Sequence, residues 1–281
     1  MLDISDVEFT TLRDLVRERF GIWYDDQKRF LLLSRLSTRV AKRGFETFGA
    51  YVRFLKDDPR REEEWTDLAS ALSNNETYFF RERAQLKALA AGILDEFIKR
   101  SPRVRLWSAA CSSGEEAFSL AMTLIETGKI PDAMLSIRAT DISPRVLELA
   151  ERGYYRALSF RATEPPMLHR WFRAQGDGFA IDDRVKKLVS FGRLNLLDSA
   201  RVAAEGPFDA IFCRNVLIYF DKPTQKRVVE SFAKALRPGG YLFLGHAESL
   251  FHLTDLYEPI IGPDAIVYRL KGDGMKLRVT A

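Results

Sequence analysis

Cysteine and histidine are scarce in this chain, and their scarcity excludes several kinds of site. Its 281 residues include two cysteines, Cys111 and Cys213, and three histidines. Two cysteines cannot form a disulfide framework, so we expect both to be small buried residues in a reducing compartment. The histidines are widely separated and show no metal-ligand spacing with the cysteines, so no metal is predicted.

Long apolar runs and a strong charge of one sign are also missing. No apolar run approaches the roughly 20 residues that a membrane-spanning helix needs, and the acidic N-terminal sequence lacks the order of a signal peptide. We therefore expect a cytoplasmic protein without membrane insertion. The chain has 43 basic and 39 acidic residues, a net charge of +4, which alone does not indicate a nucleic-acid partner.

The N-terminal quarter of the chain has the pattern of helices only. Apolar residues such as Phe9, Leu12 and Val16 recur at helical spacing, and further helical stripes follow without any alternating strand pattern. We predict an all-helical domain over residues 1–72. A linker and a connecting helix are predicted over 73–102.

From residue 103 onwards, predicted strands and helices alternate. Strands are predicted at 104–107, 135–140, 208–213 and 241–244, and helices at 115–125, 144–150 and 224–236. This alternation predicts an α/β fold over 103–281, with a parallel, doubly wound sheet. A turn is predicted at Pro238-Gly239-Gly240. Two further strand candidates, 257–261 and 265–270, lie on either side of a predicted Gly-Pro-Asp turn and are expected to complete the sheet as an antiparallel pair.

A stretch at about 153–192 interrupts the alternation. It is too long for a typical connection and contains short strand-like pieces. The sequence Gly176-Asp177-Gly178 within it is typical of a hairpin turn. We therefore predict a small inserted antiparallel β-subdomain.

The segment Ser108–Glu116 joins the first predicted strand to a helix. Its small residues would let a ligand approach the backbone closely. It has a single glycine, Gly114, and two carboxylates follow at once, which is a poor environment for a pyrophosphate. A carboxylate here suits an ammonium group, although a tight structural turn explains the segment equally well.

Asp141 ends the second predicted strand, at about the distance from Gly114 that is typical of a ribose-binding acid. It could instead cap the next helix, but Ser143 is better placed for that task. An acidic turn together with a ribose-binding acid favours a nucleoside that carries a positively charged amino acid. S-adenosylmethionine fits that description.

Three further clusters add candidate site residues. Asn195-Leu196 could address an adenine edge and face, or form a loop cap. Arg214-Asn215 follows a buried strand at the end where open α/β sheets bind ligands, and Tyr219 lies in the same loop. In the linker, Asn75, Thr77 and Arg81 accompany three aromatic residues that could simply be packing; Arg81 offers a fork of donors that matches a carboxylate.

These segments together resemble the chemotaxis receptor methyltransferase family (CheR). The order of motifs matches from about residue 5 to 270, with Asn75–Arg81 and Cys213-Arg214-Asn215-Val216 as the most specific parts. The resemblance implies a Rossmann-like methyltransferase sheet, an N-terminal helical domain, a monomer, and glutamyl ester formation on chemoreceptor helices. It implies S-adenosylmethionine as cofactor, with S-adenosylhomocysteine as product. The cofactor contacts that it implies are Asn75, Thr77, Arg81, Glu115, Asp141, Asn195, Leu196, Arg214 and Asn215.

The resemblance also places Arg81 and Tyr219 at the methyl-transfer site. A glutamate side chain with a pKa near ~4.3 is already ionised at neutral pH, so the reaction needs no general base. Arg81 would orient the substrate carboxylate, and Tyr219 would add a hydrogen bond. The alternative is a chemosensory scaffold that binds the cofactor without turnover. A nucleic-acid methyltransferase and an NAD-dependent oxidoreductase lack their expected motifs here.

Residues 28–43 contain six basic residues and no acidic one. Arg35, Arg39, Lys42 and Arg43 can share one helix face, which would attract an acidic receptor helix or merely be a solvated surface. Some family members grip a receptor tail peptide with the inserted hairpin. The loop Gln175–Gly178 is short here, so we do not expect tail binding.

Overall fold

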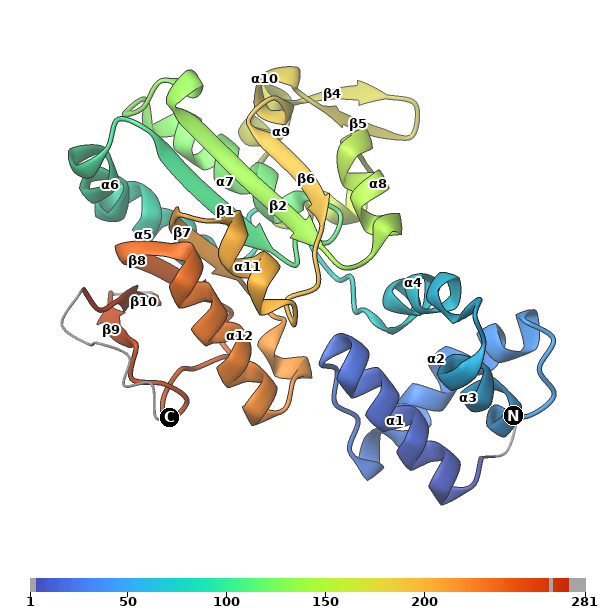
Figure 1. Ribbon diagram of the computed structural model, residues 1–281. Helices are drawn as coiled ribbons and strands as arrows, with labels where there is room; N and C mark the ends of the chain where they lie inside the picture. Colours follow the sequence, from blue (N-terminus) through green and yellow to red (C-terminus); the bar gives the residue numbers. More distant parts are fainter. Residues whose placement is uncertain (1–3, 263–264, 273–281) are drawn as a thin grey trace.

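The computed structural model describes residues 4–262 and 265–272, which form a helical domain and a sheet domain joined by a linker (Figure 1). The helical domain consists of α1 (Asp6–Phe20), η1 (Asp26–Lys28), α2 (Arg29–Lys42), α3 (Phe48–Asp57) and α4 (Arg61–Leu72). Its core includes Leu12, Val16 and Leu36, none of which is exposed, so the predicted helical stripe faces inward. None of the helices in the described ranges is long and apolar enough to cross a membrane.

Both ends of α1 are set by local chemistry. Ser5 and Glu8 form a capping box at its start, where each side chain bonds the backbone N–H of the other residue. Gly21 ends the helix with φ 77°, a conformation that favours glycine. A Cβ at Gly21 would lie 3.0 Å from both Leu197 and Thr224, so glycine also lets α1 approach the sheet domain.

The central sheet has seven strands in the order β6-β2-β1-β7-β8-β10-β9. The strands are β1 (Val104–Ala109), β2 (Leu135–Asp141), β6 (Val189–Arg193), β7 (Phe208–Cys213), β8 (Leu236–Leu244), β9 (Tyr257–Ile261) and β10 (Ile266–Leu270). The first five run parallel, and β10 pairs antiparallel with both β8 and β9, as predicted. Of the predicted Gly-Pro-Asp turn between β9 and β10, Pro263 and Asp264 lie outside the described residues.

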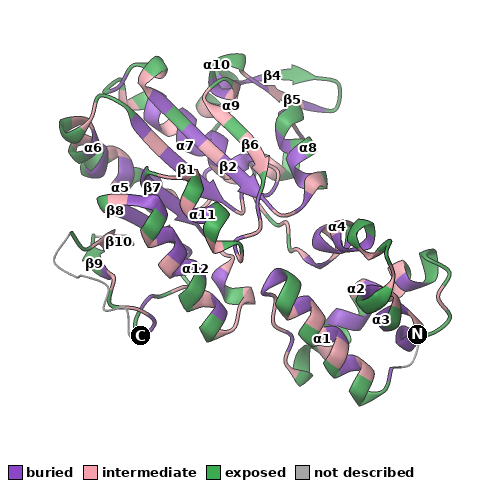
Figure 2. Ribbon diagram, in the orientation of Figure 1, coloured by how far each residue is buried: buried purple, intermediate pink, exposed green. Residues whose placement is uncertain are grey.

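Helices cover both faces of this sheet (Figure 1). They are α5 (Arg83–Ala88), the π-helical turn η2 (Leu89–Ile93), α6 (Leu94–Arg100), α7 (Glu115–Thr127), η3 (Asp132–Met134), α8 (Pro144–Arg152), α11 (Ser199–Glu205), η5 (Leu217–Tyr219) and α12 (Lys222–Ala235). Alternate residues of β1 serve two separate cores: Leu106 packs with α7, whereas Trp107 packs with α11 and α12. Figure 2 shows the result, with buried strands between helices whose outer faces are exposed. Cys111 and Cys213 are buried and free, as predicted.

The insertion is smaller than the sequence analysis predicted. Its sheet has the order β3-β5-β4, formed by β3 (Tyr154–Tyr155), β4 (Phe172–Gln175) and β5 (Gly178–Ile181). It also carries η4 (Ala157–Phe160), α9 (Pro165–Trp171) and α10 (Asp183–Lys186). The strand-like piece near 188–191, which we assigned to the insertion, belongs to β6 and pairs with β2 at the edge of the main sheet. An edge strand is partly exposed, so its sequence does not carry the apolar run of a central parallel strand.

The predicted turn at Pro238-Gly239-Gly240 is also different in the structure. These residues lie inside β8, where the pairing with β7 shifts from Phe208–Leu236 to Ala210–Tyr241. Gly239 has φ 68° at this irregularity. Glycine within a strand is typical of such bulges.

The helical domain contacts the sheet domain beyond the carboxyl ends of β1 and β2 (Figure 1). Ile22 forms an isolated antiparallel bridge with Phe220, and the Trp23 N–H donates to the Tyr219 carbonyl at 2.8 Å. Arg17 pairs with Asp221 at 2.5 Å. The chain just after α1 therefore lies directly against the loop after β7.

Candidate cofactor and methyl-transfer site

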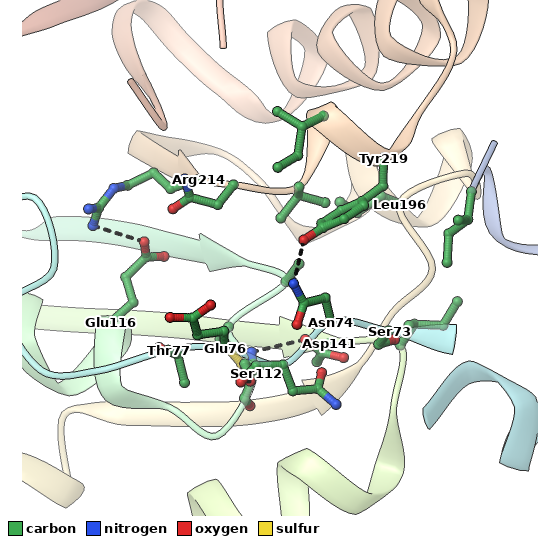
Figure 3. A pocket seen from close by; sticks show the side chains of 18 of the residues that line it. Ser73, Asn74, Glu76, Thr77, Ser112, Glu116, Asp141, Leu196, Arg214 and Tyr219 are labelled. Carbon is green, nitrogen blue, oxygen red and sulfur yellow. Dashed lines mark hydrogen bonds and ion pairs between the residues drawn. The ribbon is translucent and has the colours of Figure 1, made fainter. Parts of the chain in front are cut away.

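A cavity of about 280 Å³ lies where the two domains and the linker meet (Figure 3). The helical domain contributes Phe20, Ile22, Ala69 and Leu72 to its wall; the linker contributes 73–78 and Arg81; and the sheet domain contributes Ala110–Ser112, Glu116, Ser119, Asp141, Ile142, Leu194–Leu196, Arg214–Val216 and Ile218–Phe220. The sequence analysis predicted site residues in the sheet domain and in the linker. It did not predict that the helical domain would supply part of the wall.

The turn between β1 and α7 follows an unusual backbone path. Ala110 and Ser112 have φ values of 62° and 50°, in the left-handed region that side chains with a Cβ rarely adopt. Gly114 has φ 92°, and a Cβ there would lie 3.0 Å from Ala150. The turn thus directs backbone N–H groups towards the end of β2.

Asp141 receives one hydrogen bond from this turn and one from the residue just before α8. Its Oδ2 accepts from the Ser112 N–H and its Oδ1 from the Ser143 N–H, each at 2.9 Å (Figure 3 shows the first). Burial raises the pKa of Asp141, and the backbone hydrogen bonds oppose that rise. Each carboxylate oxygen has a second lone pair, which leaves room for the two hydroxyls of a ribose. Asp141 also serves as the acceptor at the start of α8, because the Ser143 side chain bonds Ser70 rather than the helix.

The structure places Glu116, not Glu115, in the cavity wall. The Glu115 side chain accepts from Ser113 and Ser159 and is 2% exposed, away from the cavity. Adjacent residues on a helix point about 100° apart, so only one of the pair can face the ligand. The sequence pattern Gly-Glu-Glu did not reveal which one lines the cavity, and the cofactor contact predicted at Glu115 stays a prediction.

Arg214 and two carboxylates form one charged cluster. Its Nη1 donates to Glu116 at 3.1 Å, and its Nη2 lies 3.3 Å from Glu82 (Figure 3 shows the first). The buried Nε of Arg214 has no hydrogen-bond partner among the described residues. Two carboxylates against one guanidinium leave negative charge at this end of the cavity. This acidic surplus suits an ammonium group, so the cluster fits the amino-acid end of S-adenosylmethionine.

The linker holds Arg81 between two left-handed residues. Phe80 and Glu82 have φ values of 59° and 52°. Arg81 donates from Nη1 to the Glu76 carbonyl at 3.1 Å, and its own carbonyl accepts from Arg214 Nη2 at 2.6 Å. Non-glycine residues in this conformation are uncommon and cluster at functional sites.

Asn75 and Thr77 both line the cavity, and their predicted contacts with the cofactor stay predictions. The Asn75 carbonyl accepts from the Ser112 side chain at 3.3 Å, which ties the linker to the turn after β1.

Tyr219 faces the cavity from the loop after β7. Its hydroxyl accepts from the Asn74 side chain at 2.8 Å, a contact between linker and sheet domain (Figure 3). The sequence analysis missed Asn74, although it is the neighbour of the predicted Asn75. A pair of asparagines offers no signal for which side chain points where.

Asn195 and Leu196 also line the cavity, and Leu196 is buried. The Asn195 side chain is already engaged at both ends: it donates to the Arg19 carbonyl at 2.8 Å and accepts from the Leu197 N–H at 3.0 Å. It therefore fixes the position of α1 as well as its own loop. Its predicted contact with adenine stays a prediction.

The basic face of α2 is largely occupied within the helical domain. Arg39 and Arg43 both bond Glu64, which is fully buried, and Arg39 also bonds Asp67. Arg35 donates to the Leu72 carbonyl at 2.5 Å, at the end of α4. Of the four predicted recognition residues, Lys42 alone makes no hydrogen bond or ion pair within the described residues and is exposed.

The fold and the cavity together define an S-adenosylmethionine-dependent methyltransferase. Residues 75–266 match the family model described as CheR methyltransferase, SAM binding domain, and residues 7–73 match its all-alpha domain. The chain therefore belongs to the CheR methyltransferase family, and the predicted family, fold, activity class and cofactor are confirmed.

Relatives named as chemotaxis protein methyltransferases align over 90% or more of the chain. A chemotaxis protein methyltransferase of Vibrio parahaemolyticus is 38% identical over 96% of this chain and 99% of its own length. Another, of Escherichia coli strain K12, is 39% identical over 90% of this chain and 87% of its own length. One of Pseudomonas aeruginosa is 36% identical over 96% of this chain and all of its own length.

Proposed function

We propose that this methyltransferase esterifies glutamate side chains on chemoreceptor helices, with Arg81 and Tyr219 at the transfer site. The relatives are named for chemotaxis, which supports this substrate class. The observation that supports the chemistry is that Arg81 and Tyr219 line the same cavity. Histidine and lysine do not occur among the residues that line the cavity.

The residues present suit a nucleophile that arrives already charged. A glutamate carboxylate is ionised at neutral pH, so it needs no proton acceptor. Cys111 lines the cavity, but burial raises the pKa of its thiol well above the ordinary value, so it is not a ready thiolate nucleophile. The bound cofactor would supply a methyl group on a positively charged sulfur. The protein would then align the carboxylate with that methyl group and exclude water.

Arg81 is suited to orient the incoming carboxylate. Its one side-chain hydrogen bond among the described residues uses Nη1, so donors on Nε and Nη2 remain for a substrate. Tyr219 is held by Asn74 through its oxygen, which leaves its hydroxyl hydrogen free to donate. The two side chains can therefore bind one carboxylate from the linker side and from the sheet side.

The test is methyl transfer by Arg81→Ala with a labelled cofactor and a chemoreceptor fragment. We expect the rate to fall by at least about 100-fold, because one charged hydrogen bond contributes roughly 1.5–3 kcal/mol and alignment adds to it. The product of the parent enzyme should be base-labile, as an ester is. A folded Arg81→Ala protein with normal turnover would contradict the assignment.

We also infer that the enzyme acts as a monomer in the cytoplasm, where it meets the receptor helices through α2. Lys42 is the basic side chain on that helix that has no internal partner among the described residues. Tail-peptide binding is not proposed: only Gly176 and Asp177 separate β4 from β5, which leaves a tight turn at the tip of the hairpin.

A further inference from the structure

Glu248 lies in the loop after β8 and reaches across to the loop after β7. We call residues 214–219 the cavity loop, since it carries Arg214, Asn215 and Tyr219. The Oε2 atom of Glu248 accepts from the backbone N–H groups of Asn215 at 2.8 Å and Gly245 at 2.7 Å. Its Oε1 atom accepts from those of Val216 at 2.9 Å and Ile218 at 3.3 Å. One carboxylate thus receives four backbone donors, three of them from the cavity loop.

This arrangement explains the backbone of the cavity loop. Asn215 has φ 61°, and the turn there points the N–H groups of Asn215 and Val216 at the same place. Consecutive backbone donors in such a conformation form a concave anion site. Here the anion is the protein's own Glu248 carboxylate. The charge-assisted hydrogen bonds to it stabilise the strained turn.

The cavity loop in turn holds the linker. Arg214 donates to the Arg81 carbonyl at 2.6 Å, and the Tyr219 hydroxyl accepts from Asn74 at 2.8 Å. A shift of the loop would therefore move the cluster at the amino-acid end of the cavity and the methyl-transfer residues together.

We propose that Glu248 is a positioning residue of the methyltransferase: its carboxylate fixes the cavity loop in the geometry that binds cofactor and aligns Arg81 with Tyr219. Glu248 is absent from the cavity wall and acts only through the loop. The part of the inference that concerns cofactor binding is independent of the substrate. Only its turnover readout rests on the proposed function.

Gly245 leaves the space that this contact needs. A Cβ at Gly245 would lie 2.6 Å from the Asn215 side-chain nitrogen and 2.9 Å from both the Asn215 backbone nitrogen and Glu248 Oε2. Alanine there would push the carboxylate and the loop apart without changing any charge.

The main experiment compares Glu248→Gln with Asp209→Asn. Asp209 is the matched control because its carboxylate is also buried and hydrogen-bonded. It lies near the opposite end of β7, where it accepts from the Arg105 N–H at 2.9 Å and from Arg237 at 3.0 Å. S-adenosylhomocysteine affinity is measured by calorimetry at a temperature where circular dichroism shows both variants folded. We expect Glu248→Gln to weaken binding by about 10- to 100-fold, with a matching rise in cofactor KM and a fall in kcat. Asp209→Asn should lower the melting temperature but leave affinity and kcat near those of the parent.

Equal affinity and kcat in Glu248→Gln and Asp209→Asn would overturn the proposal, because Glu248 would then contribute only to the stability of the fold. If Glu248→Gln does not fold, Gly245→Ala decides, with Gly92→Ala as its control because a Cβ at Gly92 meets nothing within 4 Å. Weaker S-adenosylhomocysteine binding in Gly245→Ala but not in Gly92→Ala supports the proposal. Unchanged binding in Gly245→Ala overturns it. Because binding is measured without a receptor, a failure of the proposed substrate would leave this result unaffected.

Discussion

The adjacent acidic residues Glu115 and Glu116 have different interaction partners. Glu116 is in contact with Arg214 at the amino-acid end of the cavity, and burial raises its pKa, with Arg214 opposing the rise. Glu115, its neighbour, also has a raised pKa from burial, but its partners are the hydroxyls of Ser113 and Ser159. The two acids therefore have different tasks in spite of their adjacency.

Glu116→Gln is expected to weaken S-adenosylhomocysteine binding by about 10- to 100-fold, because a hydrogen bond to a charged group contributes roughly 1.5–3 kcal/mol. The apo protein should not lose stability, since one of two carboxylates around Arg214 becomes neutral. Calorimetry for binding and thermal unfolding for stability check both parts. The matched control is Glu115→Gln, which should bind almost normally; the reverse order would favour the contact that the sequence analysis assigned to Glu115.

At the scale of elements, the packing of α2 against α4 depends on one buried carboxylate. Glu64 is 0% exposed and accepts from Arg39, Arg43 and the Tyr51 hydroxyl. Burial alone would raise the pKa of Glu64, but the hydrogen bonds from Arg39 and Tyr51 lower it below the ordinary value. The stability that Glu64 contributes is therefore present above its unfolded pKa and is lost as the pH falls through the lower folded value.

Glu64→Gln should lower the free energy of unfolding by about 2–3 kcal/mol at neutral pH. This is below the roughly 3–5 kcal/mol of a fully buried pair, because Arg39 and Arg43 are partly exposed and water can solvate them. The loss should shrink as the pH is lowered below the ordinary carboxylate range of roughly 4. Urea unfolding across this pH range measures it, with Asp67→Asn, a half-exposed partner of Arg39, as the mild control. An undiminished loss at low pH would argue against an ionic role.

Helix α2 also offers a test of receptor recognition. Lys42→Glu should raise the KM for the receptor fragment several-fold at low salt and much less at high salt, because exposed charges act through a screened field. Its melting temperature should not change. Arg39→Glu, in contrast, should destabilise the helical domain through Glu64. If Lys42→Glu leaves the receptor KM unchanged at low salt, α2 does not attract the receptor by charge.

At the scale of the whole molecule, the cavity joins both domains. Its wall includes Phe20 and Leu72 from the helical domain as well as Asp141 and Arg214 from the sheet domain. A ligand in this cavity contacts both sides, so its binding should stabilise the interface as well as each domain.

Saturating S-adenosylhomocysteine should therefore slow amide exchange at 20–24 and 69–78 as well as at 110–116. At a concentration of 100 times Kd, mass action adds about 2.7 kcal/mol of stability, which a thermal shift should register. Hydrogen-exchange mass spectrometry with and without ligand is the measurement. Protection that stops at the sheet domain would show that the helical domain does not close on the cofactor.

The sequence by itself determined the helical domain, the alternating strands and helices, and several of the cavity residues. These follow from local apolar periodicity and from polar residues at the ends of predicted strands, which meet at one edge of a parallel sheet. Asp141, Arg214 and Tyr219 could be found in this way. The edge strand β6 was misassigned because a partly exposed strand carries a weak pattern. The bulge in β8 was misassigned because Pro238-Gly239-Gly240 is also typical of a turn.

Only the tertiary structure decided which side chains of a motif serve the site. It turned Glu116 rather than Glu115 into the cavity, paired Arg39 and Arg43 with buried Glu64, and brought Glu248 to the cavity loop. These outcomes depend on side-chain direction and on partners far apart in the chain, which local pattern does not encode. The left-handed backbone at Phe80, Glu82 and Asn215 also depends on the tertiary structure. Surrounding contacts hold these non-glycine residues in a conformation that they do not prefer alone.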